Sequence, residues 1–211
     1  MAVEMTIDNV PISIWKFILT DTQGEQDGPA IKRPYFQNWN DRHGVDIDLT
    51  TTILEPLHMQ LTFLIRAISF SQYRSRLNAF KKKLQRPGLH VIKYPNLGDL
   101  PYFAFQSDII RVERLTTLGA AVISAKVYLS LTVPYPVGRF FTINAGTVSF
   151  RISCTTPMLI DWGDGTSAFA EGANQLFSHT YSTFTYVGIL GNIEDITSLT
   201  NIVGMLEIVE V

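Results

Sequence analysis

The chain has 211 residues, of which 46% are hydrophobic and 17% charged. This balance excludes an intrinsically disordered chain and leaves room for one large or two small domains, each with its own core. A single cysteine, Cys154, excludes an intrachain disulfide framework and a zinc site built from cysteines, and its strand-like surroundings favour a buried structural thiol over a nucleophile.

Charge is divided unevenly along the chain. Residues 1–151 carry all 17 Lys and Arg and 12 of the 19 Asp and Glu, whereas residues 152–211 carry seven acidic residues and no Lys or Arg. The formal charges of the two segments are therefore +5 and −7. A change of this size suggests a domain boundary, and opposite signs on one molecule suit a subunit that docks onto copies of itself.

The first residues, MAVEMTIDNVPISIW, show no basic stretch followed by an apolar core. We therefore expect no secretory signal and a protein that is made in, and initially retained in, a cytoplasm. No stretch approaches the ~20 uninterrupted apolar residues of a membrane-spanning helix, so no membrane span is expected either.

The first 50 residues combine one apolar stretch with two turn-rich ones. VPISIWKFIL (10–19) predicts a strand, DTQGEQDGPA (21–30) a polar loop, and RPYFQNWNDRHGVDIDL (33–49) an aromatic segment with turns. Four side chains in the last segment could suggest a metal: Asp41, His43, Asp46 and Asp48. Their spacing is not that of an EF-hand loop, and the alternation of the last two with apolar residues favours the exposed face of a strand.

Alternating apolar and polar residues dominate the next part of the chain. LHMQLTFLIRA (57–67) has this period of two, which predicts a strand with one buried face. LHVIKY (89–94), YFAFQSDIIRVERL (102–115) and AAVISAKVYLSLTV (120–133) predict three more strands. Leu118 and Gly119 stand between the last two and predict a hairpin.

One segment, at about 70–86, has the period of an amphipathic α-helix instead. Either Ser69 or Ser71 could cap its start, and Pro87 and Gly88 end it. Its apolar residues recur at spacings of three and four, which gives about four turns: Phe70, Tyr73, Leu77, Phe80 and Leu84.

The opposite face of this helix is basic. Three interpretations stay open: a solvated face, a contact with acidic neighbouring subunits, or binding of DNA, for which the short lysine run and the lack of stacking aromatics give little support. The residues of this face are Arg74, Arg76, Lys81, Lys82, Lys83 and Arg86.

The last third of the chain predicts a separate β-domain. Pro134 and Pro136 mark a linker over 134–139, because proline cannot donate to a strand ladder. We therefore expect domains at 1–133 and 140–211. The predicted strands of the second domain are 140–154, 158–162, 184–191 and 205–211.

Within this domain, LIDWGDGTSAF (159–169) is followed by SHTY (178–181). Asp164-Gly165 is typical of a type I′ hairpin turn, and Asp161 or Asp164 can accept backbone hydrogen bonds that hold it. Trp162 is then a core aromatic, and Tyr181 a buried ring with its hydroxyl bonded to the backbone. A metal site or a catalytic Asp–His pair is the alternative, but only three ligands can be named, the two aspartates and His179.

IDWGDGT, HTY and FTYVGILGNI together resemble the PKD (polycystic kidney disease type) module over roughly 140–191. That family has an immunoglobulin-like β-sandwich in which the motif Asp161, Trp162, Gly163, Asp164, Gly165, His179 and Tyr181 would determine the fold. Phe184 departs from the family pattern, which has a glycine before the aromatic strand. The resemblance implies contact with proteins or glycans and no catalysis.

The order of elements in residues 1–133 is similar to that of distal tail (Dit-like) baseplate-hub proteins of tailed phages. The matching segments are ILEPLHMQLTFLIRA, the basic helix FSQYRSRLNAFKKKLQRPG, LHVIKY and LPYFAFQSDIIRVERL. In that family a β-sandwich or barrel with one helix forms a hexameric ring under the tail tube, and a second β-domain projects outward.

The resemblance implies a structural virion protein located in the phage tail, assembled in the host cytoplasm. Its expected partners are other copies in a hexameric ring, tail-tube, tip or fibre proteins and a receptor glycan, with DNA only as passing cargo. The six basic helix residues are candidate inter-subunit contacts. No catalytic residue, metal or cofactor is expected, since no G-x-S-x-G, phosphate loop or H-E-x-x-H occurs. The alternatives are a bacterial cell-surface PKD-type binding module and a particle-associated enzyme.

Overall fold

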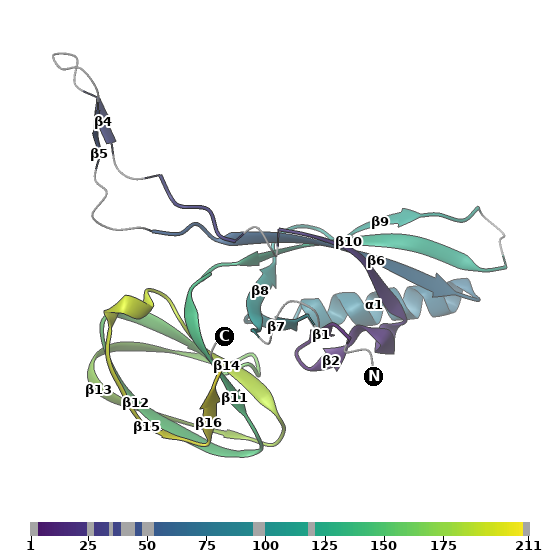
Figure 1. Ribbon diagram of the computed structural model, residues 1–211. Coiled ribbons are helices and arrows are strands. Elements are labelled where there is room, and N and C mark those ends of the chain that lie inside the picture. Colours follow the sequence, from purple (N-terminus) through teal and green to yellow (C-terminus); the bar gives the residue numbers. More distant parts are fainter. Residues whose placement is uncertain are drawn as a thin grey trace.

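The computed structural model describes residues 4–24, 28–33, 36–38, 45–47, 53–94, 100–117 and 121–208. These residues form antiparallel sheets and a single α-helix, which confirms the predicted mostly β fold with one helix. Figure 1 shows the larger sheet lying along the helix. The second sheet curls into a separate body beside one end of the larger sheet.

The first sheet has eight strands. In spatial order they are β2 (Val10–Pro11), β1 (Thr6–Ile7), β7 (His90–Lys93), β8 (Tyr102–Gln106), β10 (Ile123–Val133), β6 (Leu57–Ala67) and β3 (Phe17–Gln23), with β9 (Arg111–Arg114) also paired to β10. The two long strands β6 and β10 pair along their whole length, from Leu57 opposite Val133 to Ala67 opposite Ile123. The predicted strand at 57–67 is therefore confirmed, and its alternate residues are buried as the period of two requires.

The helix α1 (Phe70–Leu84) packs its apolar side on the buried face of this sheet. Its cap is Ser69, whose side chain accepts a hydrogen bond from the backbone N–H of Gln72 at 3.2 Å. Phe80 lies at the centre of the core, with its ring centroid 4.5 Å from that of Phe17 and 5.6 Å from that of Trp15. Phe70, which the helical period places on the apolar face, is 54% exposed because it belongs to the first turn.

Two predicted strands of the first sheet are interrupted. The segment 10–19 is divided by a 3₁₀ helix over Ile12–Trp15, and Lys16 at φ 58° redirects the chain into β3. The segment 102–115 breaks between β8 and β9, where the side chain of Asp108 accepts the N–H of Ile109 at 2.7 Å. In both places a local turn takes the place of backbone hydrogen bonds between strands. The predicted hairpin turn at 118–119 lies outside the described residues.

The second sheet has six strands. They are β13 (Ser167–Tyr181), β12 (Gly146–Asp161), β14 (Thr185–Leu190), β11 (Gly138–Ile143) and β16 (Met205–Glu207), with β15 (Ile196–Val203) paired to β12 and a 3₁₀ turn at Ile193–Asp195. The predicted strand 140–154 is wrong in its bounds, because the chain turns between β11 and β12 at 144–145. The predicted strand 158–162 is the end of β12, which continues across irregular register through Pro157.

A short connector, residues 134–137, joins the sheets. A buried apolar cluster also lies between them, with Val91 and Phe103 from the first sheet and Tyr186 and Leu190 from the second. The small hairpin of β4 (Phe36–Asn38) and β5 (Val45–Ile47) lies away from both sheets in Figure 1. Asp41, His43 and Asp48 lie outside the described residues, and of Asp46 only the backbone, paired with Gln37, is described.

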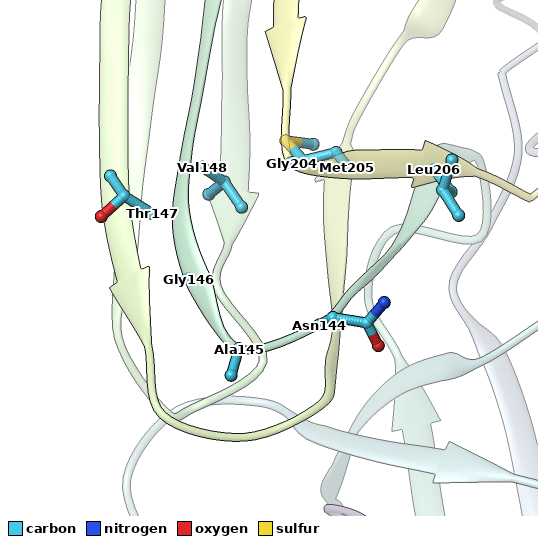
Figure 2. Close-up of a pocket in the computed structure, with 8 residues that line it drawn as sticks. All are labelled: Asn144, Ala145, Gly146, Thr147, Val148, Gly204, Met205 and Leu206. Atoms are coloured by element: carbon cyan, nitrogen blue, oxygen red, sulfur yellow. The ribbon is translucent and has the colours of Figure 1, made fainter.

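A shallow cavity of about 320 Å³ lies in the second sheet, between the β11–β12 turn and the start of β16 (Figure 2). It is lined by Asn144, Ala145, Gly146, Thr147, Val148, Gly204, Met205 and Leu206. None of these lining side chains is charged. The cavity therefore lacks the acids and bases with which general acid–base catalysis is carried out.

Candidate functional site

The turn between β12 and β13 is the Trp-Gly-Asp-Gly turn (residues 162–165). The side chain of Asp161 accepts the N–H of Gly163 at 2.8 Å, and that of Asp164 accepts the N–H of Thr166 at 2.9 Å. Gly163 and Gly165 have φ of 70° and 95°, whereas Asp164 is not among the residues with positive φ. The hairpin is present, but the type I′ turn predicted for Asp164-Gly165 is wrong, because the two glycines supply the left-handed positions instead.

Aromatic rings cover one side of this turn. The ring of Trp162, which is 5% exposed, stacks on His179 with centroids 4.9 Å apart and lies 6.0 Å from Phe150. Tyr181 meets His179 edge-on, and its hydroxyl donates to the carbonyl oxygen of Trp162 at 3.0 Å. All seven residues of the predicted motif therefore gather at one corner of the second sheet.

The two aspartates of the motif differ in their electrostatics. Burial raises the pKa of Asp161 to about 6, since the residue is only 2% exposed and its carboxyl has one backbone donor. Burial also acts to raise the pKa of Asp164, but hydrogen bonds from Thr166 and His179 outweigh it and hold that pKa below its ordinary value. Burial near these carboxyls raises the pKa of Tyr181.

The motif residues do not converge on a common point. His179 Nε2 lies 2.8 Å from Asp164 Oδ2, while Asp161 is engaged with Gly163. Across the described ranges of the chain, no group of three or more His, Cys, Asp or Glu side chains is arranged to hold a metal ion. The chemistry of this corner is that of a hydrogen-bonded turn.

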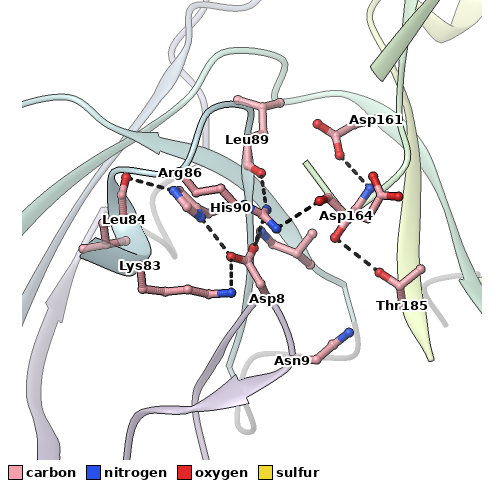
Figure 3. A network of polar contacts seen from close by, with 12 residues as sticks. Asp8, Asn9, Lys83, Leu84, Arg86, Leu89, His90, Asp161, Asp164 and Thr185 are labelled. Atoms are coloured by element: carbon pink, nitrogen blue, oxygen red, sulfur yellow. Dashed lines mark hydrogen bonds and ion pairs between the residues drawn. The ribbon is translucent and has the colours of Figure 1, made fainter. Parts of the chain in front are cut away.

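The turn packs against the first sheet at the end of the helix (Figure 3). Arg86, two residues beyond α1, donates from Nη1 to the carbonyl oxygen of Asp164 at 3.1 Å. Gly88 and Gly165 lie in close contact, because a Cβ added at Gly88 would be 3.0 Å from the carbonyl oxygen of Gly165. A Cβ at Gly163 would overlap the carbonyl oxygen of Tyr186. The turn thus serves as a contact between the two sheets.

Arg86 also belongs to a partly buried charged group, the Asp8 cluster, formed by Asp8, Lys83, Arg86 and His90 (Figure 3). Asp8 is in the two-residue turn between β1 and β2, and its carboxyl lies 3.0 Å from Lys83 Nζ, 3.3 Å from Arg86 Nη2 and 3.0 Å from His90 Nδ1. Burial acts to raise the pKa of Asp8, but hydrogen bonds from His90 and Val91 and the charge of Arg86 outweigh it and lower that pKa.

Further contacts between the two sheets are of two kinds, ring packing and side-chain hydrogen bonds. The rings of Phe103 and Phe140 stack with centroids 5.7 Å apart. Lys93 Nζ donates to the hydroxyl of Tyr186 at 2.7 Å, and Asn9 Nδ2 donates to the carbonyl oxygen of Phe184 at 2.8 Å. Together with the turn and the Asp8 cluster, these contacts form what we call the junction.

Comparison with known proteins supports this two-sheet arrangement. No protein-family model matches the sequence, and no curated protein matches it. Among solved structures, the crystal structure of the phage SPP1 Dit protein, described as a paradigm of the hub adsorption apparatus in phages infecting Gram-positive bacteria, matches with a TM-score of 0.51 and 12% identity. The match covers 98% of this chain and 99% of that one.

The chain has a Dit-like fold. The similarity in fold extends over both sheets, whereas the PKD resemblance of the second sheet stays a prediction, since no family model matches it. Among the described residues, no helix is long and apolar enough to cross a membrane.

The Dit-like fold does not gather the predicted basic face into one outer patch. Lys83 and Arg86 turn inward to Asp8, and Arg76 donates to the carbonyl oxygen of Arg66 at 2.7 Å. Arg74 lies over the ring of Phe70 at 5.8 Å. Lys81 is half-buried and Lys82 exposed. Arg74 and Lys82 are thus the exposed members of the six.

Sequence reasoning missed Asp8 and His90. Asp8-Asn9 is a turn signal, and both residues adopt positive φ, 49° and 62°, as a type I′ turn requires. That signal could have placed the turn. The pairing of Asp8 with His90, 82 residues away, has no local sequence signal, because it depends on β1 lying beside β7.

Proposed function

We propose that the chain is a structural subunit of a phage tail tip, a distal tail hub protein that assembles into a ring of about six copies. Residues 1–133 form the ring, and residues 140–211 project from it. The ring joins the tail tube to tip or fibre proteins, DNA passes through as cargo, and the projecting part is available to neighbouring proteins or a receptor glycan. The protein acts by assembly, without bond chemistry, in the virion tail.

The observation that carries this proposal is the end-to-end similarity in fold to the SPP1 Dit protein, at 98% and 99% coverage. A shared domain inserted in unrelated proteins would match only part of each chain. The bacterial cell-surface alternative rests on the PKD resemblance, which involves only about 140–191. The turn at the heart of that resemblance is packed against Arg86 and Gly88, which favours a role in architecture.

The test is the assembly state of the purified full chain. Light scattering at increasing concentration gives the mass, and negative-stain images show the shape. We expect closed rings of about six copies, because heterologous contacts that close produce cyclic oligomers. A particle that stays monomeric at high concentration, with no rings in the images, contradicts the proposal.

The part played by the basic helix in assembly can be tested separately. The double variant R74E/K82E reverses the two exposed cations of α1 and should weaken the ring if acidic neighbours contact this face. K126E is the matched control, since it reverses an exposed lysine of β10 on the face opposite the buried Ala125 and Val127. Equal ring populations in both variants would remove α1 from the subunit interface while leaving the ring itself in place.

A further inference from the structure

His90, on β7, lies between two hydrogen-bond acceptors. Its ring is 1% exposed, with Nε2 3.0 Å from the carbonyl oxygen of Leu84 and Nδ1 3.0 Å from Asp8 Oδ2. A carbonyl and an ionised carboxylate only accept hydrogen bonds, so the ring has to donate from both nitrogens. A histidine that donates from both nitrogens holds a proton on each and carries a positive charge.

Charged groups of several elements lie around the Asp8 cluster to which this ring belongs. Asp8 comes from the β1–β2 turn, Lys83 from α1 and Arg86 from the segment after α1. Across the junction, the β12–β13 turn supplies the remaining groups, Asp161 and Asp164, with His179 paired to Asp164. With His90 charged, the single carboxylate of Asp8 holds three cations together.

Arg86 connects this cluster to the second sheet. One terminal nitrogen lies 3.3 Å from Asp8 Oδ1 and also donates to the carbonyl oxygen of Leu89, and the other donates to that of Asp164. If His90 loses a proton, one ring nitrogen faces an acceptor at 3.0 Å with no hydrogen between them. Such an unsatisfied buried contact is costly, so Asp8 or the ring moves, and Arg86 loses an anchor.

We propose that His90 is a proton-controlled latch between the two sheets. Its protonated form fixes Asp8 and Arg86 and keeps the Trp-Gly-Asp-Gly turn against the first sheet, and loss of the proton releases the turn. The two hydrogen bonds of the ring, to Asp8 and to Leu84, are both made only while the ring holds a proton on each nitrogen, so one of them is lost when His90 loses a proton. Histidine is the side chain whose charge ordinarily changes near physiological pH.

The position of Asp161 also favours release of the turn as pH rises. It lies under the turn that Arg86 contacts, and burial raises its pKa to about 6. As pH rises through this value, the buried carboxyl of Asp161 becomes negatively charged beside the Trp-Gly-Asp-Gly turn of the second sheet. The latch does not depend on ring assembly, and it can be tested on the chain whether or not rings form.

The first measurement uses the wild-type chain and needs no substitution. Nitrogen-15 NMR of the histidine rings at about pH 6 should show protons on both nitrogens of His90, with a loss of one proton at higher pH. A ring with a single proton under the mildly acidic condition overturns the proposal, because the charge on which the latch depends is then absent.

The second measurement is amide hydrogen exchange of the segments 86–91 and 161–166, corrected for the intrinsic effect of pH. In the wild type, protection should fall by up to about tenfold per pH unit once His90 loses its proton in the closed state. The same amides of H90Q should be weakly protected both at mildly acidic pH and at higher pH. The matched control H58Q changes the exposed histidine of β6, which contacts Thr132, and should follow the wild type. Protection that does not change with pH in the wild type, or changes equally in H90Q, overturns the latch.

Discussion

At the scale of single residues, the junction depends on carboxyl groups in contrasting surroundings. Asp8 and Asp164 each have several donors, which hold their pKa values low, whereas Asp161 has one donor and a raised pKa. The first two contribute stability above their unfolded pKa, and this contribution is lost as pH falls. Asp161 has the opposite sign, because its folded state favours the proton.

The variant D161N should remove the cost of ionising this buried group. A pKa near 6, against 3.8 in the unfolded chain, corresponds to about 3 kcal/mol at high pH, of which about 1–2 kcal/mol develops between pH 5 and 8. We expect the advantage of D161N over wild type to grow by that amount across this range in urea unfolding. D195N is the control, since its exposed carboxyl has a lowered pKa and should give no such growth. A difference that stays constant with pH for D161N contradicts the assignment.

Trp162 should be a core residue of the second sheet. W162A removes a ring that stacks on His179 and contacts Phe150, and it should lower the free energy of unfolding by about 3–5 kcal/mol. F169A, on the same hairpin but 67% exposed, should stay within about 0.5 kcal/mol of wild type. Chemical unfolding followed by circular dichroism compares the two. Equal stability of both variants would show that the motif does not determine the fold.

At the scale of elements, the sequence offers two residues as the helix cap, and the structure selects one. Only Ser69 has the extended backbone of a cap and accepts the N–H of Gln72. S69A should therefore cost about 1 kcal/mol, whereas S71A, an exposed position in the first turn, should cost little. Thermal unfolding of the two variants makes the comparison. A larger loss in S71A would place the start of the helix elsewhere.

Elements with a strong period were predictable, and those shaped by neighbours were not. The eleven residues of β6 and the presence of the helix α1 follow directly from spacings of two and of three to four. The return strand β13 had no predicted bounds, because its small and polar residues lie mostly exposed at the edge of the sheet. The motif residues were found from the turn signal, but the partners of Arg86 come from distant segments that only the folded chain brings together.

At the scale of the whole molecule, Phe103 lies where both sheets meet. Its ring stacks on Phe140, and a Cβ at Gly188 would be 3.0 Å from it, so a larger residue at Gly188 would have to displace this ring. F103A should lower stability by about 3–5 kcal/mol and increase amide exchange on both sides of the junction. F105A, two residues along β8 and 40% exposed, is the control. Changes in exchange confined to the first sheet would mean that the cluster does not couple the two.

The junction also has a consequence for synthesis. A nascent chain that has reached residue 133 already contains Val91 and Phe103, but their partners Tyr186 and Leu190 are still to be translated. Until those residues leave the ribosome, the side chains of Val91 and Phe103 lack the partners that cover them, and Arg86 lacks its bond to the carbonyl oxygen of Asp164. Exposed apolar side chains in an incomplete chain favour aggregation, and the first part of this chain covers these side chains only when the second part arrives.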